Sequence, residues 1–287
     1  MLGFPLTGAF IKKQIIFYKK RLKYATMLRD KNVEISFINE EFIMKYDTTI
    51  DVRVDSNLKD PDGYSKILND VHKILWSKKL PNGTFFNLES KTDDDGRYIL
   101  TADINSNHIV LSSDIIITTY TEDWEWHQIG KEVIPYIADD KKKEFEKFAH
   151  TCGAFMIFPK RMKDGKTINQ NRGTHPKLYD RFDLALECLR RYFKGEYSPL
   201  FDTLKRYDAY LRLFVSFEEF CKFFLLQDLV TDDFNTVKYF IPFVDFNDKP
   251  LPKSIDEYYK FMDNCISFIE KRNSRIEVFL KNAELKT

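Results

Sequence analysis

The sequence predicts an α+β fold, with an antiparallel sheet and a crossing helix in the N-terminal half and a mainly helical C-terminal half. Residues 84–88, 98–102 and 108–119 are predicted as antiparallel strands. Apolar residues recur every three or four positions in residues 66–78 and 256–281, which is the spacing of amphipathic helices. Strands followed by helices, rather than alternating with them, are typical of α+β proteins.

The strand-rich half is predicted to begin with strands at residues 33–38 and 48–54. Ser65 is expected to cap the helix over residues 66–78, because a serine oxygen can accept a hydrogen bond from a free amide of the first turn. Turns are predicted at residues 81–83, Pro-Asn-Gly, and at residues 91–96, which contain three aspartates and a glycine.

The helix-rich half is predicted to place a polar loop ahead of a long helix. It contains one short buried strand at residues 153–158 and an aromatic strand at residues 237–243. The loop is expected just before residue 176. Helices are predicted at residues 139–150, 176–194, 198–214, 217–229 and 256–281.

We expect residues 1–44 to form a basic helical extension and residues 45–287 a single α+β domain. That domain is expected to have a strand-rich lobe, residues 45–130, and a helix-rich lobe, residues 131–287. Residues 10–29 predict a basic helix, because no acidic residue precedes Asp30. This helix either contacts nucleic acid or an acidic protein partner, or packs as an appended helix whose lysines face water.

Composition excludes several classes of protein. Lys and Arg number 45 against 44 Asp and Glu, so overall charge gives no argument for binding a polyanion. No run of 18 apolar residues occurs, and we therefore expect no membrane span. Cys152, Cys188, Cys221 and Cys265 are widely separated, which argues against a zinc knuckle and favours the reducing cytoplasm.

The familiar catalytic motifs are missing from the sequence. It has no GxxxxGK[ST], no GxGxxG after a strand, no HExxH and no GxSxG. A P-loop NTPase, a dinucleotide-dependent dehydrogenase and a zinc protease of the HExxH type are therefore disfavoured. The sequence predicts no metal site and indicates no particular cofactor.

Residues 166–193 hold the densest set of hydrogen-bonding side chains in the chain. Such groups need partners or a ligand when they lie among apolar residues. They are Asn169, Asn171, Arg172, His175, Asp180, Arg181, Asp183, Glu187, Arg190 and Arg191.

This segment gives our candidate ligand-binding residues Asn169, Arg172 and Arg181. Arg172 precedes Gly173, so a bidentate guanidinium lies beside a residue that lets a ligand approach the backbone closely, which suits a phosphate or carboxylate. Asn169 could orient an amide or a base edge. Asp183 and Glu187 are the candidate catalytic acid and base. The alternative is a buried or solvated salt-bridge network without a ligand.

A second candidate group lies at the end of the helix over residues 66–78. His72 could transfer protons near neutral pH, Trp76 could stack on a base, and Lys78 could bind an anion. The alternative is a histidine that is only hydrogen-bonded within the core.

A third pattern comprises Asp60 and Asp62 around Pro61, followed by Glu89-Ser90-Lys91. It resembles the layout of metal-dependent nucleases. Asp-Pro-Asp-Gly is also an ordinary turn, and we favour that interpretation.

Several segments occur in the order found in a known family. They include DPDGYSKIL, VHKILWSKKLPNG, LSSDIIITTY and GAFMIFPKRMKDGKTINQNRG. Over roughly residues 45–280 the chain resembles an uncharacterised bacterial family known only as a domain of unknown function. The resemblance implies no activity. Members of that family have an alanine at the position of Asn171.

Two functions remain open. The first is an enzyme that binds or modifies a nucleotide or nucleic acid, such as a transferase acting as a toxin or phage-defence effector. The second is a non-catalytic binding or regulatory module, in which the same residues form a buried polar network and the basic first helix contacts a partner.

Overall fold

The computed structural model describes residues 47–57, 59–104, 107–120, 128–160 and 165–284. The chain divides into two units, Met1–Tyr46 and Asp47–Thr287, and every described residue belongs to the second. The helix and the strand predicted at residues 10–29 and 33–38 lie outside the described residues.

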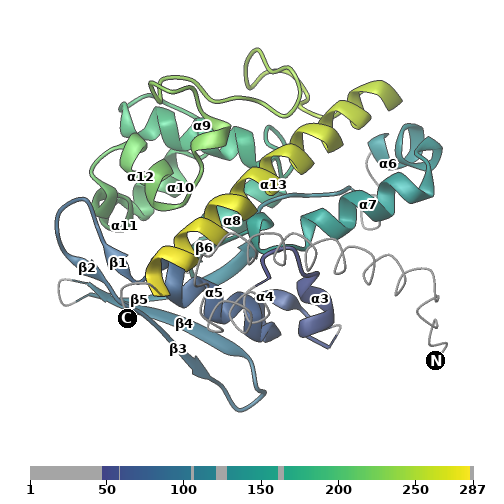
Figure 1. The fold of residues 1–287 in the computed structure, drawn as a ribbon. Coiled ribbons are helices and arrows are strands. Elements are labelled where there is room, and N and C mark those ends of the chain that lie inside the picture. The colour runs from purple at the N-terminus through teal and green to yellow at the C-terminus, as the bar shows by residue number, and fades with distance from the viewer. Residues whose placement is uncertain (1–46, 58, 105–106, 121–127, 161–164, 285–287) are drawn as a thin grey trace, which may run out of the picture. The chain divides into compact units, whose positions relative to one another are not determined.

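A four-stranded antiparallel sheet, in the order β3-β4-β5-β6, confirms the predicted sheet (Figure 1). Its register pairs Leu100 with Leu111 and Asp114 with Met156. One face carries buried apolar side chains, because alternate residues of a strand point to the same side. The strands are β3 (Leu88–Thr92), β4 (Tyr98–Ile104), β5 (Asn107–Ile115) and β6 (Phe155–Pro159), and a separate ribbon joins β1 (Lys78–Lys79) to β2 (Phe85–Phe86).

The crossing helix, α5 (Lys66–Trp76), begins where the sequence predicted. The Ser65 hydroxyl oxygen accepts a hydrogen bond from the Leu68 amide at 3.0 Å. The strand predicted at residues 48–54 is wrong. That segment forms a turn and the short helix α3 (Val52–Asp55), because the Asp51 carboxylate accepts the amide of Arg53 and caps a helix start. A second short helix, α4 (Pro61–Tyr64), precedes α5.

The C-terminal half is mainly helical, as predicted. Its longest helix, α13 (Ile255–Glu284), packs on α5, on α7 (Asp139–Ala149) and on the 3₁₀ turn η2 (Cys152–Ala154) (Figure 1). The remaining helices are α6 (Gln128–Glu132), η1 (Ile134–Tyr136), α8 (Ile168–Thr174), α9 (Phe182–Phe193), α10 (Phe201–Arg206), α11 (Asp208–Leu211), η3 (Arg212–Phe214), α12 (Phe217–Phe223) and η4 (Gln227–Leu229).

The polar segment differs from its prediction. The expected loop is the helix α8, because Thr167 and Gln170 form a reciprocal capping box. The expected long helix starts six residues later, at Phe182. Tyr179 and Asp180 both adopt positive φ, 48° and 60°, which breaks the helix between α8 and α9.

The strand predicted at residues 237–243 is also wrong, since only Val237 makes a bridge, to Val230. Side chains take the backbone groups that a partner strand would have used. The Phe240 amide donates to Asp183, and the Ile241 carbonyl accepts from Arg181. Each of the helices predicted at residues 198–214 and 217–229 is divided into shorter α-helices and 3₁₀ helices.

Within the described part of the chain, α13 is long enough to cross a bilayer, but neither it nor any other helix is apolar enough.

Candidate functional site

Arg181 and Asp183 form a sealed ion pair at the start of α9. The two side chains are fully buried, and Nε and Nη2 of Arg181 lie 3.1 and 2.5 Å from the Asp183 carboxylate. Arg181 also donates to the Pro250 and Ile241 carbonyls, and Asp183 accepts the Phe240 amide. With its donors and acceptors used by protein groups, this pair holds residues 240–250 against α9.

Glu187 is held by two arginines on the next turns of the same helix. Arg190 donates to both carboxylate oxygens at 2.7 and 2.8 Å, and Arg191 donates to one of them at 2.7 Å. Burial alone would raise the pKa of Glu187, but these hydrogen bonds more than offset it and lower the pKa. Near neutral pH Glu187 is therefore ionised, and both of its carboxylate oxygens accept hydrogen bonds from the two arginines.

His72 lies in a closed core network on α5. Trp76 Nε1 can only donate, and it donates to His72 Nδ1 at 3.0 Å, so the ring proton is on Nε2 and faces Ser113 Oγ at 3.0 Å. Burial, with a smaller contribution from the Arg272 cation, lowers the pKa of His72 to about 3. The ring stays neutral at physiological pH.

Arg172, Glu187 and His72, which come from the two candidate groups, share no hydrogen bond or ion pair in the described part of the chain. Trp76 stacks on His72, and Lys78 Nζ lies 5.0 Å from the centre of the Trp76 ring. Arg172 and Asn169 lie close to two aspartates, Asp62 and Asp114. These four residues form the candidate site.

Arg172 is a buried arginine that is only partly satisfied. Its side chain projects from α8 and is 4% exposed. Nη2 donates to the Ile115 carbonyl at 2.8 Å. Nε lies 3.0 Å from the Asp180 carboxylate, but its N–H direction misses that oxygen, so neither Nε nor Nη1 makes a hydrogen bond with a described residue. Nη1 therefore remains available to a ligand, whereas Nε is covered by the Asp180 carboxylate.

Two aspartates, Asp62 on α4 and Asp114 on β5, lie close enough to Arg172 to interact with it electrostatically. Burial, together with the Asp114 and Asp60 charges, raises the pKa of Asp62 to about 8 against the lowering effect of Arg97 and Arg172. Burial also raises the pKa of Asp114 to about 6, against hydrogen bonds from Ser112 and Asn169. The pair therefore holds one proton between about pH 6 and 8.

Unpaired polar atoms are concentrated at this place. Among the described residues, seven buried side-chain atoms have no hydrogen-bond partner, and four of them are Asp62 Oδ1, Asn169 Oδ1, and Nε and Nη1 of Arg172. Buried polar groups normally have partners, so these four atoms need water or a ligand. We call Asp62, Asp114, Asn169 and Arg172 the acid–arginine site.

Sequence reasoning missed Asp114 and gave Asp62 only a nuclease-like metal role. The signal for Asp114 was a carboxylate directly before the apolar run Ile115–Ile117 in a predicted strand, but one sequence does not reveal which strand faces α8. Among the described residues no cluster of three metal-binding side chains occurs. The metal-dependent nuclease pattern therefore gains no support there.

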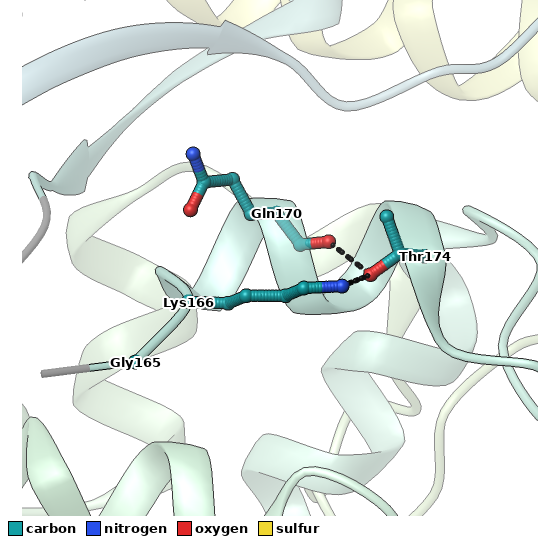
Figure 2. A pocket seen from close by; sticks show the side chains of 4 residues that line it. All are labelled: Gly165, Lys166, Gln170 and Thr174. Carbon is teal, nitrogen blue, oxygen red and sulfur yellow. Dashed lines mark hydrogen bonds between the residues drawn. The ribbon is translucent and has the colours of Figure 1, made fainter.

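A surface hollow of about 390 Å³ on α8 is distinct from the acid–arginine site (Figure 2). It is lined by Gly165, Lys166, Gln170 and Thr174, and Lys166 Nζ donates to the Thr174 hydroxyl at 2.8 Å. Gln170 and Thr174 lie half a helical turn away from Arg172, on the outer face of α8. We therefore do not assign the ligand to this hollow.

Fold and site together define an α+β protein with a partly satisfied polar site of two carboxyls, an amide and a guanidinium. The chain belongs to the family of unknown function DUF6994, whose profile matches residues 46–276. No curated protein and no solved structure matches the chain.

Proposed function

We propose that the acid–arginine site binds a nucleotide, free or within a nucleic acid, and transfers a proton during its modification. The observation that supports this proposal most is the set of four unpaired polar atoms in one place. Guanidinium donors, an amide oxygen and a carboxylic acid suit a ligand with both an anionic group and hydrogen-bonding edges.

In this proposal Arg172 binds a phosphate. Nη2 donates to the Ile115 carbonyl and Nε faces the Asp180 carboxylate, whereas Nη1 has no hydrogen-bond partner among the described residues. Nη1 can donate to a phosphate oxygen in a charge-assisted hydrogen bond. Asn169, with its unpaired Oδ1, orients a donor on the base or on an amide.

The two aspartates supply the proton chemistry. Asp62 is the proton donor and Asp114 the acceptor, because their raised pKa values place one proton on the pair near neutral pH. This assignment moves the acid–base role from Asp183, Glu187 and His72, which have other partners, to two residues whose protonation changes in the working range. Arg181, whose donors also have partners within the protein, has a structural role in this proposal.

The proposed setting is the bacterial cytoplasm, as a transferase-type toxin or phage-defence effector. All four cysteines are free and buried, which fits a reducing compartment. The predicted basic helix over residues 10–29 would contact a nucleic acid or acidic protein partner.

A thermal-shift screen of the full chain against nucleotides, dinucleotides and short oligonucleotides tests the proposal. A ligand at 100 times its dissociation constant should add about 2.7 kcal/mol of stability. A clear rise in melting temperature with at least one of these compounds is expected. Unchanged melting with the whole panel would contradict the proposal.

The alternative is a non-catalytic binding module, which the satisfied network of Arg181, Asp183 and Glu187 favours. Turnover separates the two. Incubation of the bound nucleotide with the protein should give a new product by mass spectrometry if the acid pair is catalytic, and intact nucleotide if the site only binds.

A further inference from the structure

Lys78, at the start of β1, has an environment that the acid–arginine site does not explain. Its half-buried side chain places Nζ 5.0, 4.4 and 4.9 Å from the ring centres of Trp76, Phe223 and Phe279. Nζ donates to the Phe223 carbonyl at 2.7 Å. Three aromatic rings and one backbone carbonyl thus surround the amine.

The Lys78 amine has no counter-ion in the described part of the chain, because none of the carboxylates there forms an ion pair with it. Its charged neighbour is another cation, Arg272, which donates to the adjacent Phe224 carbonyl at 3.1 Å.

Ring faces stabilise an ammonium by about 0.5–2 kcal/mol each, whereas removing a charge from water costs several kcal/mol. Burial, helped by Arg272, accordingly lowers the pKa of Lys78 to about 7.

An apolar groove of about 400 Å³ adjoins the amine. Phe279 belongs both to the ring cage and to the groove wall, so the groove and the cage around Nζ are separated by no more than this one side chain. Val278 in the same wall is 58% exposed. The cation in the wall, Arg275, is already paired with Asp228 at 2.6 Å. The groove therefore suits an apolar compound better than an anion.

We propose that Lys78 is a nucleophilic amine that condenses with an apolar aldehyde or ketone entering along this groove. Nζ attacks the carbonyl carbon, both amine hydrogens leave with the carbonyl oxygen as water, and a C=N bond to the lysine remains. Burial without a counter-ion is how proteins keep a lysine unprotonated for such chemistry. The inference is independent of the acid–arginine site.

Reductive trapping on the full chain tests it. The protein is incubated at pH 7 with benzaldehyde and sodium cyanoborohydride, and the benzylated lysines are identified by peptide mass spectrometry over time. Lys79, the next residue and exposed, is the matched control. We expect Lys78 to be labelled at least about tenfold faster than Lys79, because an ordinary lysine is almost fully protonated at pH 7.

The pH profile and a groove variant complete the test. Labelling of Lys78 should reach half its maximum near pH 7, while labelling of Lys79 still rises above pH 9. Val278→Glu, an exposed substitution, should slow labelling of Lys78 by about threefold or more and leave Lys79 unchanged. Equal labelling of the two lysines, or labelling of Lys78 that Val278→Glu does not slow, would overturn the proposal.

Discussion

Asp62 is the residue at which stability and the proposed function oppose each other. Its pKa is raised from 3.8 to about 8 on folding, so the folded protein holds a proton there that the unfolded chain has lost. Folding therefore takes up a proton between about pH 4 and 8, and the contribution of Asp62 to stability falls as pH rises through this range. Such a cost is common where a site needs a neutral acid.

We expect Asp62→Asn to stabilise the protein at pH 8 by about 1–3 kcal/mol and to reduce the decline in stability between pH 5 and 8. Urea unfolding at several pH values measures this. Asp95→Asn in the exposed hairpin turn is the control and should change neither the stability nor its pH dependence. A variant at Asp62 that is less stable than the wild type at pH 8 would contradict the assignment.

For single residues, the sequence identified two of the four members of the acid–arginine site. Asn169 and Arg172 stood out because polar side chains were dense around them. Asp62 was noticed only for a metal role, and Asp114 was missed, since its partners come from α8 and α4, far away in sequence. Asp183 and Glu187 had the right chemistry, but a single sequence does not reveal that arginines already occupy them.

The long helix α13 is fastened to the sheet by one buried cation. Arg272 is fully buried and donates to the Gly153 and Phe155 carbonyls at 2.7 and 2.8 Å and to the Phe224 carbonyl. Its guanidinium thus joins η2, β6 and the end of α12 to α13. No described carboxylate pairs with it, and burial lowers its pKa to about 9.

Replacing this residue should destabilise the whole fold. Arg272→Met leaves three buried carbonyls without partners, and we expect a loss of about 3–5 kcal/mol in the free energy of unfolding. Arg275→Met, one turn further on, removes a more exposed pair with Asp228 and should cost less than about 1 kcal/mol. Guanidinium unfolding of both variants checks this, and equal losses would contradict the role of Arg272.

The sequence predicted the type of element correctly where the residue pattern was clear, as in α5, α7, β4, β5 and α13. The prediction was wrong where side chains replaced backbone partners. Residues 240–241 have the composition of a strand, but Arg181 and Asp183 bind their backbone groups. Residues 167–174 look like a polar loop, but the Thr167 capping box makes them helical.

For the whole molecule, we propose that residues 47–287 are the independent folding unit. Val52 and Thr48 at its start are fully buried, and the described core lies within this unit. A chain beginning at Asp47 should melt within about 3 °C of the full chain, because the whole of the described core lies in residues 47–287. A chain beginning at Lys66 loses α3, α4 and the Ser65 cap and should not give a cooperative transition by calorimetry. A chain from Asp47 that fails to fold would contradict the proposed boundary.

Calorimetric titration tests the central proposal, that the acid–arginine site holds an anionic ligand beside a shared proton. The nucleotide selected by the thermal-shift screen is titrated at pH 7 in two buffers of different ionisation enthalpy. An anion near Asp114 raises the pKa of that carboxyl, so binding should take up a fraction of a proton.

The matched variants are Asn169→Ala, which should weaken binding by about tenfold or more, and Arg53→Gln on the surface of α3, which should bind like the wild type. Proton uptake in the wild type together with weaker binding only in Asn169→Ala is the result we predict. Buffer-independent heat, or equal affinity of wild type and Asn169→Ala, would contradict it.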